Sequence, residues 1–396
     1  MTETRYTRRG FGFRAEVHKD VEREFDSRLV KKMKDQENRL EAGGLTFRLA
    51  AEFGFCYGVD RAVDYAYETR RVYPDRRIFL MGEIIHNPVV NQRLLDMEIP
   101  IVADPIAEVP DLGEQDVVII PAFGVPGPTL TKLKEAGPVL VDTTCGSVLV
   151  VWKNVSRYAK SGFTSIIHGK WWHEETRATA SQALMQPDGK YLVVLNIEDA
   201  TLVCDYIRGK GDREAFLRHF KDASSPGFDP ETDLERIGMA NQTTMLATES
   251  LEVASLVKEA MAERYGEEAV DDRFIAFDTI CSATQERQDA LLTLLEEPLD
   301  LALIVGGYNS SNTGHLARIA AGKVPTYHIQ FAGEILGPDR IRHRDTKTGE
   351  IRETADWLPD GELSIGLTAG ASTPNLEVGR VVRRVLECRG VAPAEA

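Results

Sequence analysis

The sequence predicts an α/β fold with mainly parallel sheets, divided into three related domains. From Leu45 onward, short apolar runs of strand length alternate with amphipathic stretches of helix length, a pattern typical of parallel α/β units. A cysteine also recurs at one position of this pattern, because Cys56, Cys145 and Cys281 each follow an apolar run and precede a predicted helix. This repetition indicates three pseudo-related domains.

Apolar runs bounded by turn residues predict the strands, and amphipathic stretches predict the helices. Strands are expected at 45–53, 77–81, 116–120, 138–141, 164–167, 191–195, 273–277, 301–305, 325–329 and 363–367. Helices are expected at 60–72, 148–160, 176–184, 251–265, 284–295, 313–321 and 375–387. This order gives a polar N-terminal extension at 1–44 and α/β domains at 45–143, 144–277 and 278–396, the last with a C-terminal helix.

Polar segments interrupt this alternation. Residues 205–236 are charged and contain several glycines and prolines, so we expect an inserted excursion in the second domain. A polar loop is expected at 337–357. The extension at 1–44 lacks an apolar segment and mixes bases with acids, so it resembles neither a signal peptide nor a transit peptide. We expect a polar extension without chemistry, part of which, at 20–40, forms a solvated helix.

The composition excludes several classes of protein. With 62 acidic against 47 basic residues, the net charge is −15, which argues against a nucleic-acid-binding protein but permits a local anion pocket. The sequence contains no apolar run of the roughly 20 residues that cross a membrane. Five dispersed cysteines exclude a dense disulfide scaffold and favour a reducing compartment, so we expect a cytoplasmic protein.

Polar residues gather where the predicted strands end, which is where open α/β sheets bind ligands. These residues are His86, His173, Glu175, Thr243, Ser310, Ser311, Asn312 and Ser372. The serines and the asparagine suit either helix N-capping or anion binding by helix N-termini. The two histidines suit either backbone contacts or the same anion. His18, His219 and His343 lie in charged segments and are expected at the surface.

Glu175 and the cysteines leave similar alternatives open. Glu175 is either an acid favoured by the helix dipole or a proton donor. Cys204 and Cys388 lie in apolar surroundings and are expected to pack. The three cysteines at strand-to-helix turns are expected to have lowered pKa values and to act as nucleophiles or metal ligands. Without a CxxC pair a zinc finger is disfavoured, whereas three converging thiolates would suit a [4Fe–4S] cluster with one open iron.

These motifs together resemble the 4-hydroxy-3-methylbut-2-enyl diphosphate reductase family over roughly residues 45–388. The matching segments, in order, are Gly54-Phe55-Cys56-Tyr57-Gly58-Val59, His86-Asn87, Asp142-Thr143-Thr144-Cys145, His173-Glu174-Glu175-Thr176, Gln242-Thr243-Thr244, Cys281-Ser282-Ala283-Thr284, Asn309-Ser310-Ser311-Asn312 and Thr368-Ala369-Gly370-Ala371-Ser372. The long N-terminus and the insert resemble the plant and cyanobacterial branch.

The resemblance implies a trefoil of three α/β domains around a central [4Fe–4S] cluster with three cysteine ligands, Cys56, Cys145 and Cys281. It implies Glu175 as the proton donor, with Thr243 beside it. The residues implied to hold the diphosphate are His86, His173, Ser310, Ser311, Asn312 and Ser372. The implied reaction removes the substrate's hydroxyl with two electrons and two protons and gives isopentenyl and dimethylallyl diphosphate, the last step of the methylerythritol phosphate pathway.

The family also implies an external electron donor of the ferredoxin or flavodoxin class, while the composition predicts neither a nucleic acid nor a membrane as partner. Docking of such a donor to an acidic chain requires a local basic patch. The arginine-rich start of the chain is one candidate, and it contains Arg5, Arg8, Arg9 and Arg14.

The chain departs from the family pattern at two places. Phe123 stands where many members have a histidine, which removes one diphosphate donor, and Trp171-Trp172 stands where we expect a smaller residue beside one aromatic. Two other functions remain open. One is a three-cysteine [4Fe–4S] dehydratase of the quinolinate synthase type, and the other is a cluster-free binding or regulatory module.

Overall fold

The computed structural model describes residues 5–277 and 279–391, which form two compact units. Unit 1 contains the described residues through Arg8 together with Ala103–Cys281. Unit 2 contains Arg9–Val102 and the described residues from Ser282 onward. Both units are α/β with mainly parallel strands, which confirms the predicted class. Asp278, the expected first residue of the third domain, lies outside the described residues.

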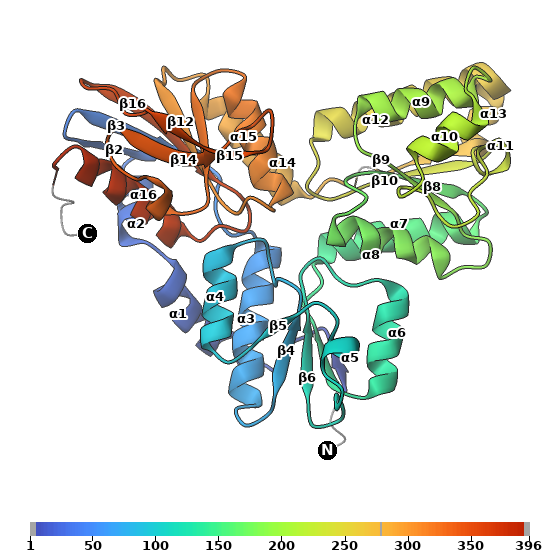
Figure 1. Ribbon diagram of the computed structural model, residues 1–396, viewed down its shortest axis with the longest axis horizontal. Helices are drawn as coiled ribbons and strands as arrows, with labels where there is room; N and C mark the ends of the chain where they lie inside the picture. The colour runs from blue at the N-terminus through green and yellow to red at the C-terminus, as the bar shows by residue number, and fades with distance from the viewer. Residues whose placement is uncertain (1–4, 278, 392–396) are drawn as a thin grey trace. The chain divides into compact units, whose positions relative to one another are not determined.

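A four-stranded parallel sheet forms the core of unit 1. Its order is β11 (Phe274–Ala276), β10 (Ile237–Asn241), β8 (Thr164–His168) and β9 (Tyr191–Val194). Figure 1 shows α9 (Ile197–Ile207) and α12 (Ala247–Tyr265) over one face, and α7 (Gly146–Lys160) and α8 (Glu174–Leu184) over the other. Because helices cover both faces, β8 and β10 are buried throughout.

Strand β10 was not among the predicted strands. Its sequence, Ile-Gly-Met-Ala-Asn, contains one β-branched residue and a glycine, so it lacks the usual strand signal. The glycine has a packing reason, because a Cβ on Gly238 would lie 2.4 Å from the Tyr158 ring. Tertiary packing against α7 therefore decides this strand.

The charged insert folds onto this sheet. It forms the end of α9, then α10 (Arg213–His219) and α11 (Pro230–Asp233). Phe216, Phe220 and Phe228 are buried in the unit 1 core, and the rings of Phe216 and Phe220 lie 4.7 Å apart. These three aromatic side chains thus attach the polar insert to the core of unit 1.

Unit 1 also contains a parallel strand set. Strand β6 (Val117–Ile120) pairs with β7 (Val139–Asp142), and β7 pairs with β1 (Tyr6–Thr7). Helices α5 (Pro105–Glu108), α6 (Gly127–Ala136) and α13 (Glu267–Arg273) complete the unit.

A seven-stranded sheet forms the core of unit 2. Its order is β15 (Ile351–Ala355), β14 (Arg340–Arg344), β13 (Thr326–Ile329), β12 (Leu301–Val305), β16 (Leu363–Ala369), β3 (Leu45–Leu49) and β2 (Arg39–Ala42). The four strands from β13 to β3 are parallel. Strand β3 begins the segment expected to form the first domain (45–143). It pairs instead with β16, from the segment expected to form the third domain (278–396).

Strand β12 shows how this sheet is covered on both sides. Leu301, Leu303 and Val305 pack with α2 (Arg28–Asp35) and α16 (Asn375–Cys388). Ala302 and Ile304 point the other way, to α14 (Ser282–Leu294) and α15 (Ser311–Ala321). This period of two is expected for a strand between two helical layers.

The N-terminal extension is largely folded in unit 2. Helix α1 (Arg14–Phe25) packs on α3 (Tyr57–Val72), with the side chains of Val17, Val21 and Phe25 buried. These three apolar residues lie four positions apart, which is a helical spacing. The many charged residues between them hid this pattern in the sequence. Helix α4 (Pro88–Asp96) and the parallel pair β4 (Ile78–Met81) and β5 (Ile101–Val102) lie in the same unit.

The expected polar loop at 337–357 is instead an antiparallel hairpin of β14 and β15, preceded by the short η1 (Ala332–Glu334). Ile341 and His343 alternate with arginines and face inward. His343 is buried, so the prediction that it lies at the surface was wrong.

None of the described helices combines the length and hydropathy that crossing a bilayer requires.

Candidate functional site

The parallel strands of unit 1 bring several candidate residues to one edge. His173 and Glu175 follow β8, Thr243 follows β10, and Cys281 follows β11. Since β8, β10 and β11 are adjacent and parallel, their carboxyl ends meet. The Cys281 N–H donates to the carbonyl of Thr243 at 3.3 Å, which ties the two turns together.

Cys145 and Cys281 are close within this unit. Cys145 is the N-cap residue of α7, and Ser147, in the first turn of α7, has its hydroxyl 3.4 Å from Cys281 Sγ. Both cysteines are partly exposed free thiols. Two sulfurs from two strand-to-helix turns therefore converge, as a shared metal group requires.

Electrostatics at Cys145 differ from the expectation. Burial raises the pKa of the Cys145 thiol, the hydrogen bond from the Ser147 N–H lowers it, and the negative charges of Cys281 and Glu175 raise it further. The net effect is a raised pKa, so the predicted lowering by the helix N-terminus was wrong for this residue. A thiol whose ionised form is disfavoured in this way gains from a nearby cation that neutralises it.

Glu175 lies in the first turn of α8 and is 2% exposed. Its Oε1 accepts the Thr243 N–H at 2.6 Å, and its Oε2 accepts the Thr243 hydroxyl at 3.0 Å. The dipole at the start of the helix favours an acid at this position. An exposed glutamate without hydrogen bonds to Thr243 would gain the same benefit, so the dipole does not explain the burial and the two bonds. The segments that follow β8 and β10 therefore position Glu175 and Thr243 against each other.

Gln242 fixes this pair, although the sequence did not single it out as a site residue. It is completely buried, and its Oε1 accepts the Lys170 N–H and the Thr176 hydroxyl, each at 3.1 Å. These bonds hold the loop after β10 against the start of α8. The signal that marked it was its place directly before Thr243.

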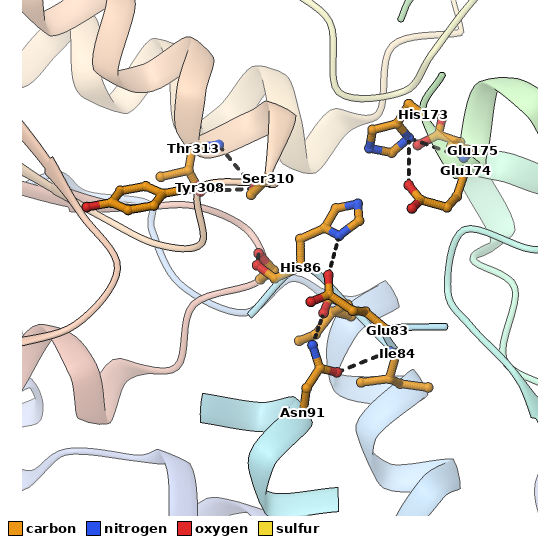
Figure 2. A network of polar contacts seen from close by, with 12 residues as sticks. Glu83, Ile84, His86, Asn91, His173, Glu174, Glu175, Tyr308, Ser310 and Thr313 are labelled. Carbon is orange, nitrogen blue, oxygen red and sulfur yellow. Dashed lines mark hydrogen bonds and ion pairs between the residues drawn. The ribbon is translucent and has the colours of Figure 1, made fainter. Parts of the chain in front are cut away.

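His173 caps α8, because its Nδ1 accepts the Glu175 N–H at 3.2 Å; Figure 2 shows this bond. The ring of Phe123 meets the His173 ring edge-to-face, with centroids 5.6 Å apart. Phe123 therefore orients the histidine by packing. Trp171 and Trp172 are 41% and 50% exposed and pack edge-to-face with each other.

A buried carboxylate supports the turn that holds Cys145. Asp142, at the end of β7, accepts the Thr144 N–H at 2.9 Å and the Thr144 hydroxyl. The Tyr6 hydroxyl also donates to Asp142, and Arg8 Nε does so at 2.6 Å. Although burial raises the pKa of Asp142, these hydrogen bonds and the Arg8 charge lower it below its ordinary value.

Cys56 occupies the matching position in unit 2. It is the N-cap residue of α3, and its N–H donates to the Ala371 carbonyl at 3.2 Å. The buried Arg287 guanidinium donates to the Gly54 carbonyl at 2.7 Å and to the Phe55 carbonyl at 3.1 Å. Gly54 has a φ of +80°, and a Cβ there would lie 2.7 Å from the Asn375 side chain, so this turn requires glycine.

The neutral donors of unit 2 lie at the ends of β12 and β16, which are adjacent and parallel. Ser310 caps α15, where its Oγ accepts the Thr313 N–H at 3.3 Å (Figure 2). Asn312 Oδ1 accepts the Ala371 N–H at 2.9 Å, which joins the two loops. Asn312 Nδ2 is buried without a hydrogen-bond partner among residues 5–277 and 279–391, and such a donor indicates a missing acceptor.

Ser372 and His86 share this part of unit 2. The Ser372 hydroxyl donates to the His86 carbonyl at 3.3 Å. A Cβ on Gly307 would lie 2.3 Å from that carbonyl, so the glycine permits the close approach. His86 Nδ1 lies 2.8 Å from Glu83 Oε2, as Figure 2 shows. Ser311 is buried in the first turn of α15.

The two packing cysteines behave as expected. Cys204 is 1% exposed in the unit 1 core, and Cys388 packs at the end of α16 on the unit 2 core.

Ser147 was missed as a site residue. A hydroxyl two residues after a candidate cysteine ligand could have marked it, because the first helical turn turns side chains back toward the N-cap.

Comparisons with known proteins match nearly the whole chain. The family model described as LytB protein matches residues 47–386. The 4-hydroxy-3-methylbut-2-enyl diphosphate reductase of Gloeobacter violaceus is 48% identical, over 100% of this chain and 95% of the relative. The enzyme of the same name from a Synechococcus strain is 48% identical, over 97% of this chain and 94% of the relative.

Two solved structures resemble the chain. One is an (E)-4-hydroxy-3-methyl-but-2-enyl diphosphate reductase, described as the terminal enzyme of the non-mevalonate pathway, with a TM-score of 0.52 and 27% identity. It covers 86% of this chain and 99% of that structure. The other, a reductase from Plasmodium falciparum, has a TM-score of 0.61 and 21% identity over 88% of this chain and 90% of that structure, and supports the fold alone.

Proposed function

Because the chain belongs to the LytB protein family, we propose that it reduces 4-hydroxy-3-methylbut-2-enyl diphosphate to isopentenyl and dimethylallyl diphosphate. The step takes up two electrons and two protons, breaks the carbon–oxygen bond and releases the hydroxyl as water. It is the last reaction of the methylerythritol phosphate pathway. The observation that carries this proposal is the near-complete match to reductases of this name, and this match favours a reductase over a dehydratase of the quinolinate synthase type.

The three cysteines at strand-to-helix turns are the proposed ligands of a [4Fe–4S] cluster. The residues fit such a group, because Ser147 bridges from the Cys145 turn to Cys281 Sγ within unit 1, and Cys56 holds the same N-cap position in unit 2. Bound there, the cluster would supply electrons and polarise the carbon–oxygen bond of the substrate. The five cysteines form no disulfide within the described residues, which supports a reducing, cytoplasmic compartment.

Glu175 is the proposed proton donor. It is buried, so a proton that it delivers is shielded from bulk water, and Thr243 contacts both of its oxygens. The Thr243 hydroxyl can pass a proton to Oε2 over 3.0 Å. General acid assistance at a leaving hydroxyl contributes about 10²- to 10⁴-fold to rate.

The diphosphate is the proposed ligand of Ser310, Ser311, Asn312 and Ser372, together with His86 and His173. Two features support the assignment in unit 2. Helix α15 starts at Ser311 and offers backbone N–H groups at its N-terminus, and Asn312 Nδ2 is a buried donor without an acceptor among the described residues. Neutral donors and a helix dipole can hold a diphosphate even on a chain of net charge −15.

The test is anaerobic turnover by the purified chain after reconstitution with iron and sulfide. We expect a brown protein with about four irons and four sulfides, which consumes the substrate with a chemical reductant and forms both products. A folded but colourless, iron-free protein, or a cluster-bearing protein without turnover, would contradict the proposal. The external donor itself is proposed to be of the ferredoxin or flavodoxin class.

A further inference from the structure

One face of α7 combines exposed apolar and cationic side chains. Val150 is 56% exposed, and Lys153, Arg157 and Lys160 are exposed as well. At 3.6 residues per turn these four positions fall on one stripe of the helix. We call them, together with Phe277, the α7 face.

The charge of this stripe is unusual for the chain. Helix α7 has three cations and no acid, whereas no other helix that the structure describes has more than one cation without an acid, and the net charge is −15. No ion pair joins these cations to an acid within residues 5–277 and 279–391. The helix dipole favours Arg157 and Lys160 in the last turn, but it does not account for Lys153 at mid-helix.

Phe277 extends the α7 face beyond the helix. Its ring is 42% exposed and stacks on Tyr158, with centroids 6.3 Å apart. The Arg157 guanidinium lies 4.4 Å from the centroid of this ring, so a cation–π contact fixes Arg157 beside an exposed aromatic. An apolar and cationic surface of this kind suits a protein partner with acidic groups around an apolar centre.

The α7 face is also close along the chain to both candidate ligands of unit 1. Cys145 is the N-cap of α7, and Val150 lies about 7.5 Å farther along the helix axis at 1.5 Å per residue. Phe277 stands four residues before Cys281. The Val150 end of this face is therefore near the Cys145 turn, and Phe277 is near Cys281 along the chain.

In the other basic candidate, the arginine-rich start of the chain, three of the four arginines are paired with acids. Arg5 pairs with Glu114 at 2.6 Å, Arg8 with Asp142 at 2.6 Å, and Arg14 with Asp64 at 2.7 Å. Each of these arginines thus supports the fold of its own unit. The cations of α7 keep their charge available for a partner.

We propose that the α7 face docks an acidic one-electron carrier protein of the ferredoxin class. This inference rests on the proposed function, which requires an external reductant. Each reduced carrier gives one electron per encounter, so two carriers are oxidised for each substrate. With two protons taken up, a carbon–hydrogen bond forms, the carbon–oxygen bond breaks and water leaves. Opposite charge steers the encounter, and Val150 and Phe277 supply apolar contact.

The test reverses the charge of the α7 face in the reconstituted full chain with K153E, R157E and K160E together. The control carries K132E, K221E and K258E, which lie exposed in the same unit and change the net charge equally. For both variants and the parent chain we measure kcat/KM with a reduced acidic [2Fe–2S] ferredoxin, turnover with dithionite, and calorimetric binding of oxidised ferredoxin.

We expect the reversed α7 face to lower kcat/KM for ferredoxin by roughly tenfold or more at low salt, with unchanged dithionite turnover and weaker ferredoxin binding. High salt should reduce the difference, because it screens exposed charges. Equal effects in the two variants, or unchanged ferredoxin binding by the reversed face, would overturn the proposal. Absence of dithionite turnover in the parent chain would refute the proposed function instead, and the binding measurement would still decide the docking surface.

Discussion

The candidate residues of the two units differ in chemistry. Unit 1 brings together groups that can exchange protons or ligate a metal, namely Cys145, Cys281 and Glu175 with Thr243. Unit 2 presents mainly neutral donors at helix starts, among them Ser310 and Asn312. An anion held by neutral donors needs no compensating cation, so the donors of unit 2 can bind a diphosphate on an acidic chain. We therefore expect substitutions in unit 1 to affect the chemical step and substitutions in unit 2 to affect substrate binding.

The largest expected effect is at the thiols of unit 1. Cys145→Ser should lose the iron–sulfur cluster and all turnover, because a hydroxyl is a poor ligand for iron in such clusters. Cys388→Ser, at the end of α16, should keep both. Iron and sulfide counts after anaerobic reconstitution check this prediction, and equal iron in the two variants would remove Cys145 from the ligand set.

The next largest effect is at the proton donor. Glu175→Gln should lower kcat by about 10²- to 10⁴-fold while the cluster remains, because the amide keeps the bonds to Thr243 but supplies no acidic proton. Glu174→Gln changes an exposed carboxylate of the same helical turn and should leave kcat nearly unchanged. Steady-state kinetics with a chemical reductant decide between them. A near-normal rate for Glu175→Gln would end its role in proton transfer.

A moderate effect is expected where the N-terminal segment supports the Cys145 turn. Asp142→Asn should destabilise the folded chain by about 1–3 kcal/mol at pH 7, because charge-assisted hydrogen bonds are lost. The pKa of Asp142 is lowered from 3.8 by its hydrogen bonds and Arg8, so its stabilisation is present above pH 3.8 and is lost as the pH falls below that value.

Urea unfolding of the apo-protein at several pH values measures this contribution. The difference between the parent chain and Asp142→Asn should be largest near neutral pH and should shrink below pH 3.8. A difference that does not depend on pH would mean that the charge of Asp142 contributes nothing.

A smaller effect is expected at the neutral donors of unit 2. Asn312→Ala should raise KM by roughly tenfold with little change in kcat, since one hydrogen bond to a charged ligand is worth about 1.5 kcal/mol. Asn196→Ala is the matched control, because Asn196 caps α9 in unit 1. It should lower the melting temperature without raising KM, whereas an unchanged KM in Asn312→Ala would exclude its donor role.

The smallest effect is expected at Phe123, whose ring packs against His173. Phe123→His adds a donor and should change KM by less than about tenfold, while Phe123→Leu adds none and should lower the rate only through a looser His173. A loss of activity in Phe123→His larger than in Phe123→Leu would show that an apolar side chain at this position matters more than the added donor.

Elements with a strong local sequence pattern could be predicted, whereas elements that depend on tertiary packing could not. Strand β12 was predicted to the residue, because Leu301–Val305 is a continuous apolar run between polar turns. Strand β10 and the helix face of Val17, Val21 and Phe25 were missed, because their signal depends on what they pack against. A contact such as Arg8 with Asp142 joins residues far apart in sequence, which no local pattern can indicate.

The candidate site shows the same limit. The strand-end positions of Glu175 and Thr243 could be found from the pattern, but their hydrogen bonds could not. The raised pKa of Cys145 follows first from burial, which the position of a residue at a helix start does not reveal. Gln242 and Ser147 act through neighbouring residues, and only their sequence positions next to Thr243 and near Cys145 could have indicated them.

The most direct test of the division between the units is calorimetric binding of the substrate to two anaerobically reconstituted variants. Glu175→Gln should bind with a Kd within about threefold of the parent chain, and Ser372→Ala should bind roughly tenfold more weakly, as loss of a hydrogen bond to a charged group predicts. The reverse pattern, with tight binding by Ser372→Ala and weak binding by Glu175→Gln, would contradict the account.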